Sequence, residues 1–316
     1  MRKLVDLSAG PAPLVPTRLV PTRSDLWADW NVLNWALKIA AKLVLSRLPL
    51  SYGFLRSLGM FRHGYMNQSG YAVRIFKNHM NRVGGPEAFS GKVCLELGPG
   101  DSLASAILAH AMGARKTFLI DVGAFAEPRA TVYEEVIDEL AAEGCPVADL
   151  RGFSSLEDLL ERTGAVYLTN GMDSLRSIPT GSVDIIWSQA VLEHIRVRQL
   201  PALLGELRRI LSDTGTMSHR IDYKDHLDRS LNNLRFPTRI WEAEAMARSG
   251  FYTNRIRNTE FLGLIEAAGF ELTDVHLDYW PEVPLPRRKL AKEFQSLSDE
   301  DLRTRGATVA ARVKSG

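Results

Sequence analysis

Short apolar runs alternate with stretches of helical periodicity through most of the 316-residue chain. Strands are predicted at 93–95, 117–120, 165–169, 183–187 and 216–221, and helices at 103–112, 130–144, 155–162, 200–211 and 260–268. Buried strands that alternate with helices predict a doubly wound α/β fold with a mostly parallel sheet. Two further strand-like segments, 271–279 and 307–313, would add a C-terminal antiparallel hairpin and complete a seven-stranded sheet. The stretch between them, 281–301, is predicted to project as a loop with a helix.

The segment before this alternating region has a different character. Residues 1–24 are rich in Pro, Arg and Thr, and a helix is predicted at 27–48, where apolar positions recur at helical spacing. Lys38, Lys42 and Arg47 argue against a membrane-spanning helix. The helix is expected to pack on the protein or a partner, and an interfacial membrane helix is the alternative. A further helix is predicted within 57–84.

This pattern divides the chain into two parts. Residues 1–85 are expected to form an N-terminal helical extension, which acts as a cap or as a contact for a partner or a membrane surface. Residues 86–316 are expected to form a Rossmann-like domain with an insertion at about 222–258 beside the substrate site. Insertions at this edge of an α/β sheet commonly form the wall of a substrate pocket.

Composition narrows the class of protein only modestly. The net charge of +2 and the 45% apolar content indicate a globular protein and do not favour nucleic-acid binding. Cys94 and Cys145 are predicted to be unpaired, as in a reducing cytoplasm. Prolines interrupt the N-terminus, which has no convincing signal-peptide pattern, so a cytoplasmic protein with an optional membrane contact through 27–48 is expected.

The motif KVCLELGPGDS, residues 92–102, is the chemically most informative stretch. It predicts a buried strand that breaks at Gly98 and Gly100 before a helix, which is the arrangement of a nucleotide-type cofactor loop. A dinucleotide fingerprint requires a third glycine, and that position is Leu103. The carboxylates of Glu96 and Asp101 would repel a diphosphate but would suit a ligand that carries an ammonium and a sulfonium group.

The second strand ends in Asp121, where an acidic acceptor for ribose hydroxyls is expected. Together, ELGPGDS and Asp121 resemble the class I S-adenosylmethionine-dependent methyltransferases. The resemblance covers about residues 90–315 and implies S-adenosyl-L-methionine as the cofactor. It also implies that Asp173 accepts a hydrogen bond from the adenine amino group and that Met172 lies beside the ring. A turn-forming role for Asp173 is the alternative.

The fourth strand runs into SQAVLEHI, residues 188–195, at the carboxyl edge where open α/β sheets bind ligands. Ser188 and Gln189 are therefore expected to contact the cofactor. The Glu193–His194 pair resembles that of quinone-type O-methyltransferases, which use another carboxylate three residues earlier to help hold a metal. Ala190 occupies that position here, so no metal site is predicted.

Methylation of a hydroxyl requires a residue that accepts its proton, and histidine has a suitable pKa. His194 and His219 are the candidate bases, and Asp222 would orient a histidine or act as the base itself. For each histidine, a strand-end residue held by backbone hydrogen bonds is the alternative. The predicted function is O-methylation of a small-molecule or glycan hydroxyl. The alternatives are a nicotinamide-dependent oxidoreductase, which a six-stranded all-parallel sheet would favour, and a noncatalytic binding protein.

Overall fold

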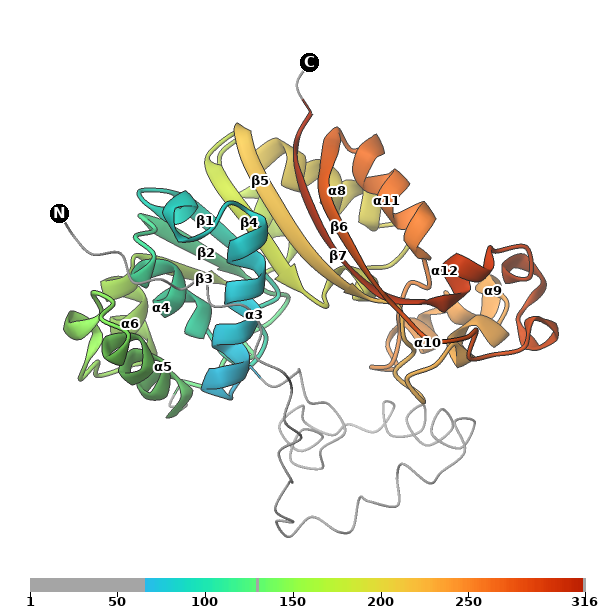
Figure 1. Ribbon diagram of the computed structural model, residues 1–316, viewed down its shortest axis with the longest axis horizontal. Helices are drawn as coiled ribbons and strands as arrows, with labels where there is room; N and C mark the ends of the chain where they lie inside the picture. The colour runs from blue at the N-terminus through green and yellow to red at the C-terminus, as the bar shows by residue number, and fades with distance from the viewer. Residues whose placement is uncertain (1–65, 129–130, 315–316) are drawn as a thin grey trace, which may run out of the picture.

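The computed structural model describes residues 66–128 and 131–314 (Figure 1). The predicted helix 27–48 and the membrane contact proposed for it lie outside the described residues. None of the helices within 66–128 and 131–314 is long and apolar enough to cross a membrane. The strands are β1 (Val93–Leu97), β2 (Lys116–Ile120), β3 (Ala165–Leu168), β4 (Val183–Gln189), β5 (Leu211–Asp222), β6 (Phe270–Tyr279) and β7 (Thr304–Val313).

The seven strands form one sheet in the order β3-β2-β1-β4-β5-β7-β6. The first five strands pair in parallel, whereas β7 is antiparallel to both β5 and β6. This arrangement confirms the predicted doubly wound sheet with its C-terminal antiparallel hairpin. It does not match the six-stranded all-parallel sheet that would favour a nicotinamide enzyme.

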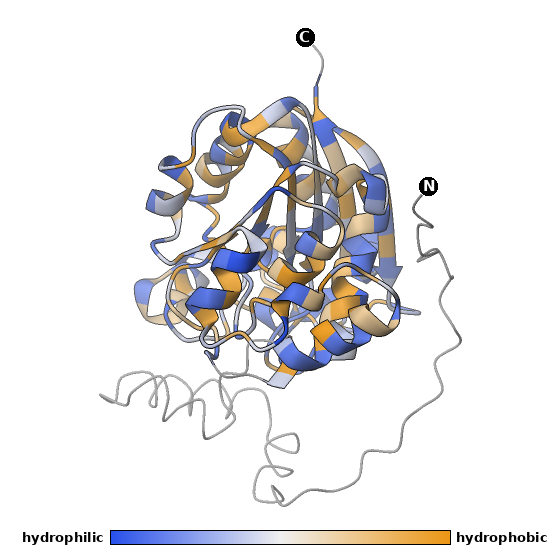
Figure 2. Cartoon of the chain, turned by 90° about the vertical axis from the view of Figure 1, so that its left-hand side faces the viewer, coloured by the Kyte–Doolittle hydropathy of each residue, from blue (hydrophilic) through white to orange (hydrophobic). Residues whose placement is uncertain are grey.

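Helices cover both faces of the sheet, and each face has its own hydrophobic core (Figure 2). One face carries α3 (Ser69–Arg82), α4 (Ala104–Ala111), α5 (Thr131–Ala142) and α6 (Leu156–Thr163). The other face carries α7 (Met172–Arg176), α8 (Leu200–Ile210) and α11 (Asn258–Ala267). The side chains of Ile186 and Trp187, which are neighbours on β4, enter opposite cores because strand side chains alternate.

The helix predicted within 57–84 is present as α3, and aromatic side chains fasten it to the sheet. The ring of Phe76 lies 5.3 Å from that of Phe89 and 5.7 Å from that of Trp187 on β4. Phe89 belongs to the short helix η2 (Pro86–Phe89) that precedes β1. Because β4 carries the loop at the candidate site, this cluster fixes α3 relative to that loop.

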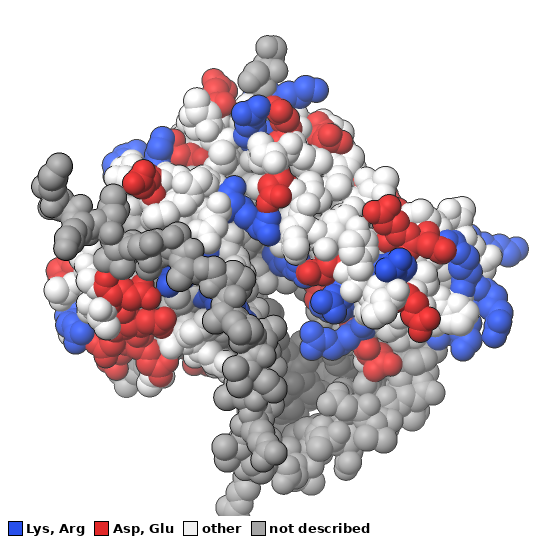
Figure 3. Space-filling view, in the orientation of Figure 1, with Lys and Arg blue, Asp and Glu red and all other residues white. Residues whose placement is uncertain are grey.

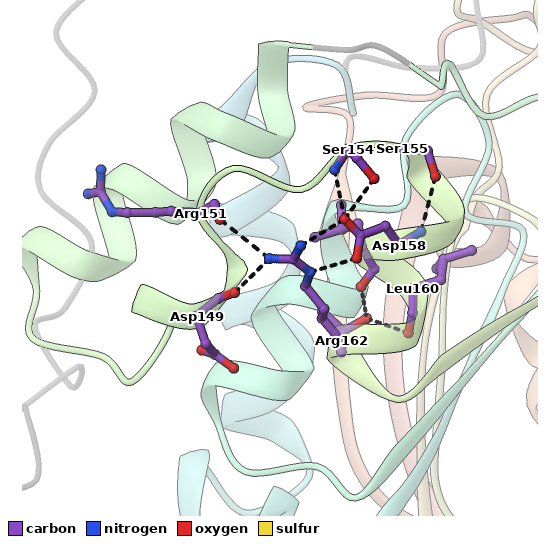
Figure 4. A network of polar contacts seen from close by, with 9 residues as sticks. Asp149, Arg151, Ser154, Ser155, Asp158, Leu160 and Arg162 are labelled. Atoms are coloured by element: carbon purple, nitrogen blue, oxygen red, sulfur yellow. Dashed lines mark hydrogen bonds and ion pairs between the residues drawn. The ribbon is translucent and has the colours of Figure 1, made fainter.

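Helix α6 shows how local sequence sets an element's ends (Figure 4). The Ser155 side chain accepts a hydrogen bond from the Asp158 N–H at 3.2 Å, which is an N-cap, and the left-handed Gly164 follows the last turn. The Asp158 carboxylate pairs with Arg162 at 2.6 Å.

On α5 the carboxyl side chains face outward, as the sequence predicted. Acidic residues gather on this side of the molecule (Figure 3).

The predicted insertion forms a second lobe with the segment between β6 and β7 (Figure 1). We define the second lobe as residues 223–257 and 280–303. Its short helices are η5 (Asn232–Arg235), α9 (Thr238–Trp241), α10 (Glu244–Ala247), η6 (Arg287–Lys289), η7 (Lys292–Phe294) and α12 (Asp299–Arg303). One apolar cluster gathers around Trp241, and another joins Leu234 to Leu285 and Leu302. The stretch 281–301 is therefore folded against the insertion and does not stand apart as a loop.

Candidate functional site

The candidate site lies at the carboxyl ends of β1, β2, β4 and β5. The chain reverses its direction of winding between β1 and β4, because β2 and β3 lie on one side of β1 while β4 and β5 lie on the other. Such a switch point leaves a crevice between the two diverging loops, and ligands of open α/β sheets bind there. The two loops are the glycine turn after β1 and the turn after β4 that continues into η4 (Leu192–His194).

The glycine turn needs both of its glycines. Gly98 and Gly100 each have φ of 72°, in the left-handed region that favours glycine. The Gly98 N–H donates to the Ile120 carbonyl at 2.7 Å, which ties the turn to the end of β2. A Cβ atom on Gly98 would lie 2.5 Å from Cγ2 of Val191. The two loops of the crevice therefore touch, and the absence of a side chain at Gly98 makes this contact possible.

Asp121 follows β2 and holds the other side of the glycine turn. Its Oδ2 accepts the Gly100 N–H at 3.1 Å and its Oδ1 accepts the Val122 N–H at 2.7 Å. Each carboxylate oxygen has a further lone pair, so the group can also accept from two adjacent hydroxyls. Val122 itself is 75% exposed, an unusual state for an apolar residue beside a polar turn. Sequence reasoning missed Val122, whose only signal was its position after the acid.

The other two predicted carboxylates of the motif are buried. Glu96 is 2% exposed and bonds to the Ser105 hydroxyl and the Trp187 side chain. Burial raises the pKa of Glu96 to about 7, so its charge changes near neutrality. Asp101 is 6% exposed and lies near the phenol of Tyr133. Both side chains are therefore largely shielded from solvent.

Met172 and Asp173 begin helix α7, and a hydrogen bond ties the start of this helix to Asp121. The N–H of Gly171, just before α7, donates to the Asp121 carbonyl at 2.8 Å. Met172 is half-buried, whereas the Asp173 side chain is exposed and pairs with Arg176 at 2.9 Å. The two residues are thus on the same rim as Asp121 and Val122.

The predicted residues at the end of β4 form two polar pairs on opposite faces of the sheet. On the face of α8, the Ser188 hydroxyl lies 2.7 Å from Nδ1 of His219 on β5. On the face of α3, His79 bonds through Nε2 to Oε1 of Gln189 at 3.2 Å and through Nδ1 to the Ser218 hydroxyl at 2.8 Å. The amide oxygen only accepts, so Nε2 of His79 carries the proton and Nδ1 accepts from Ser218.

Both buried histidines are neutral. Burial lowers the pKa of His79 to about 4 and that of His219 to about 3. Nε2 of His219 has no hydrogen-bond partner among the described residues. Sequence reasoning did not foresee that His219 is enclosed, since burial of a strand-end residue depends on the elements packed over it.

The turn after β4 carries the remaining candidates. Glu193 is 2% exposed, and its Oε1 accepts the N–H of Asp222 at 3.2 Å, which joins the ends of β4 and β5. His194 is exposed, its Nδ1 lies 3.1 Å from the Tyr252 carbonyl, and its ring stacks on that of His226 at 5.0 Å. The Asp222 carboxylate pairs with Lys224 at 3.0 Å.

The structure therefore brings the predicted residues together in pairs rather than as one triad. Glu193 meets Asp222 and Ser188 meets His219, while Gln189 meets His79 of the N-terminal helix α3. His194 has an exposed ring and His219 has a buried one, so the two candidate bases occupy different environments. Within residues 66–128 and 131–314, no three His, Cys, Asp or Glu side chains are arranged to hold a metal ion.

Comparison with known proteins gives matches to solved structures only. Neither a protein-family model nor a curated protein matches the chain. An S-adenosylmethionine-dependent methyltransferase from Mesorhizobium loti is 16% identical, with 71% of this chain and 92% of that chain covered and a TM-score of 0.39.

Two other matches have different chemistry in their names. Geranyl diphosphate C-methyltransferase from Streptomyces coelicolor is 13% identical, with 77% and 79% covered and a TM-score of 0.43. Its structure contains Mg²⁺, geranyl diphosphate and S-adenosyl-L-homocysteine. The [4+2]-cyclase SpnF is 15% identical, with 78% and 82% covered and a TM-score of 0.42. At these low identities and TM-scores, the residues of the site have to decide the function.

The contact between the two loops can be tested by Gly98→Ala. The left-handed backbone costs roughly 1–2 kcal/mol for a residue with a Cβ, and overpacking against Val191 adds on the order of 1–3 kcal/mol. Gly181→Ala is the matched control, since Gly181 has φ of 64° and nothing within 4 Å of its Cβ position. Urea unfolding should show a larger loss for Gly98→Ala. Equal losses in the two variants would contradict the close contact.

Glu193 predicts a pH dependence of stability. Burial and the nearby Asp222 raise the pKa of Glu193 from 4.5 to about 8, so the folded state holds this proton more tightly than the unfolded chain does. The proton on Glu193 stabilises the folded state. This stabilisation is fully present below pH 4.5 and is lost as the pH rises through 8. When the pH is raised from 6 to 9, the free energy of unfolding should fall less in Glu193→Gln than in the unmodified protein. The difference between the two falls should be roughly 1–3 kcal/mol.

The control for this experiment is Glu135→Gln, on the exposed side of α5. This variant should follow the unmodified protein at every pH. If Glu193→Gln also follows the unmodified protein across this range, the buried carboxyl does not titrate as described.

Proposed function

We propose that the protein is an S-adenosyl-L-methionine-dependent methyltransferase that acts on a hydroxyl of a small-molecule or glycan acceptor. The observation that carries this proposal is the junction of the glycine turn with Asp121. The Gly100 N–H is held by Oδ2 of Asp121 at 3.1 Å, at the switch point of a sheet that ends in an antiparallel hairpin. This is the geometry expected where a nucleoside lies against a bare backbone turn.

Different residues at the site suit the different chemical groups of S-adenosyl-L-methionine. The two oxygens of Asp121 suit the ribose hydroxyls, and exposed Val122 with half-buried Met172 offers an apolar surface to the adenine. A carboxylate at Asp101, beside the glycine turn, favours a cationic ligand over a diphosphate. Leu103, fully buried, stands where a dinucleotide site needs glycine, which disfavours the nicotinamide alternative.

His194 is the residue we assign as the base. When bound, S-adenosyl-L-methionine supplies an activated methyl group, so this chain has to orient the acceptor and take its proton. The Tyr252 carbonyl only accepts, so Nδ1 of His194 carries the proton, and Nε2 is the acceptor nitrogen of this exposed ring. His219 fits this role less well, because its ring is enclosed and its pKa is about 3. The Asp222 carboxylate is paired with Lys224, which disfavours it as the base.

The second lobe is the part of the chain that we assign to the acceptor. It supplies the partners of His194, since Tyr252 and His226 both belong to it.

On the neighbouring strands, Arg220 of β5 donates to the Thr308 hydroxyl at 3.2 Å and pairs with Asp278 at 2.5 Å. These polar groups on the face of α3 suit an acceptor that carries several hydroxyls better than a purely apolar one.

Binding of the donor can be tested by Asp121→Ala. Loss of a carboxylate that accepts from two hydroxyls should weaken S-adenosyl-L-methionine binding by roughly 1–3 kcal/mol, as measured by calorimetry. Asp138→Ala removes an exposed carboxylate on α5 and should leave the affinity unchanged. Unchanged affinity in Asp121→Ala would show that the ribose lies elsewhere.

The assignment of the base can be tested by His194→Gln. Formation of S-adenosyl-L-homocysteine with phenol or glycan acceptors should fall by roughly 10²–10⁴, because proton abstraction is lost, while donor affinity stays close to that of the unmodified protein. His110→Gln, on the last turn of α4, is the control. Turnover within a few-fold of the unmodified rate in His194→Gln would remove His194 from this role.

A further inference from the structure

Residues 251–257, the part of the second lobe that leads into α11, form a buried strap. All seven residues are buried, yet none of them belongs to a helix or a strand. Irregular chain normally lies on the surface, because buried backbone N–H and C=O groups need partners that irregular structure does not supply by itself. The strap therefore depends on the side chains and carbonyls of other elements for its hydrogen bonds.

Asn254, in the middle of the strap, makes three of these hydrogen bonds to the turn after β4. Its backbone N–H donates to the Glu193 carbonyl at 2.7 Å. Its side-chain Nδ2 donates to the Leu192 carbonyl at 2.8 Å and to the Ile195 carbonyl at 3.0 Å. Its Oδ1 accepts the Ile256 N–H at 3.2 Å. A carboxylate cannot replace this amide, because two carbonyl oxygens require two N–H donors.

The turn that Asn254 holds is strained and faces the glycine turn. Ala190 has φ of 54°, a left-handed conformation that is unfavourable for a residue with a Cβ. Such conformations persist only where the surroundings hold them in place. The next residue, Val191, is the one that fills the space beside Gly98. Release of the turn would thus move Val191 away from the glycine turn and widen the crevice.

The other residues of the strap are tied to the rest of the second lobe and to the C-terminal hairpin. The indole N–H of Trp241 donates to the Thr253 carbonyl at 2.7 Å, and Arg255 donates to the Phe236 carbonyl at 2.6 Å. Arg257 donates to the carbonyls of Asp301 and Thr304 at the base of β7. The strap therefore has a fixed support on one side and the turn after β4 on the other.

We propose that Asn254 is a positioning residue for the donor site. It holds the turn after β4 against the glycine turn, and through this contact it sets the affinity for S-adenosyl-L-methionine without touching the ligand. This inference rests on the proposed function for its ligand. The mechanical link itself, from Asn254 through Leu192 and Ile195 to Val191 and Gly98, depends only on the described contacts.

The test compares Asn254→Asp and Asn254→Ala with Asn233→Ala. Asn254→Asp keeps the size of the side chain and its acceptor but loses both N–H donors. Asn233 is the matched control: it is 2% exposed, lies in the same lobe, and donates through Nδ2 to the Thr253 hydroxyl at 3.0 Å. All three variants remove a buried hydrogen bond, so all three should lose stability in urea unfolding. Only the control leaves the turn after β4 intact.

Two readouts separate positioning from a purely structural role. Calorimetry should show S-adenosyl-L-methionine affinity reduced about tenfold in both Asn254 variants and unchanged in Asn233→Ala. Hydrogen exchange without ligand should be faster at the backbone amides of His194 and Ile195 in the Asn254 variants alone. Donor affinity equal to that of the unmodified protein in both Asn254 variants would overturn the proposal.

Failure of the proposed function would give a different pattern. If the unmodified protein does not bind S-adenosyl-L-methionine, the ligand assignment is wrong, and hydrogen exchange still reports on the link. Exchange at His194 and Ile195 that is the same in the Asn254 variants and in Asn233→Ala would then overturn the positioning role as well.

Discussion

The contact between Gly98 and Val191 is the constraint on which the candidate site depends. A parallel sheet leaves two loops at its switch point, and nothing in the sheet itself sets the distance between them. Here Gly98 has no side chain, so the Val191 side chain can approach the backbone more closely than a Cβ atom at this position would allow. Asp121 holds one loop from the side of β2, and Asn254 holds the other from the second lobe. The site is thus built from two loops, and each loop is held by hydrogen bonds from a residue of another segment.

Burial then divides the polar residues of the site into two kinds. Asp121 and His194 keep groups at the surface and can meet a ligand. Glu96, Glu193 and His219 are enclosed, and desolvation favours the neutral form of each of these side chains. The enclosed groups therefore act on neighbouring elements: Glu193 bonds the N–H of Asp222, and His219 bonds Ser188. This division limits the chemistry that we assign to the chain to a few exposed side chains.

The parallel core could be predicted because its strands are buried on both faces and so consist of apolar runs. The beginning of β5 was predicted too late: the polar stretch 212–215 indicated a turn that ends a helix, whereas β5 begins at Leu211, which pairs with Val183. The packing of 281–301 on the insertion had no periodic signal, because Leu285 and Leu302 meet Leu234 across distant parts of the chain.

The candidate site, too, could be predicted from local motifs but not from contacts between distant parts of the chain. Gly98, Gly100 and Asp121 belong to a local motif whose spacing is visible in the sequence, and the structure places them in one turn. The environments of His194 and His219 could not be separated, because a histidine's burial is set by the elements that fold over it. Asn254 gave no signal at all, since the carbonyls to which its side chain donates lie about 60 residues earlier in the chain.

The most direct test of the central claim is calorimetric titration of the full-length protein with S-adenosyl-L-methionine and, separately, with NAD. The account predicts saturable binding of S-adenosyl-L-methionine, competition by S-adenosyl-L-homocysteine, and no binding of NAD at the same concentrations. Binding of NAD without binding of S-adenosyl-L-methionine would contradict it and would assign the glycine turn to a different cofactor.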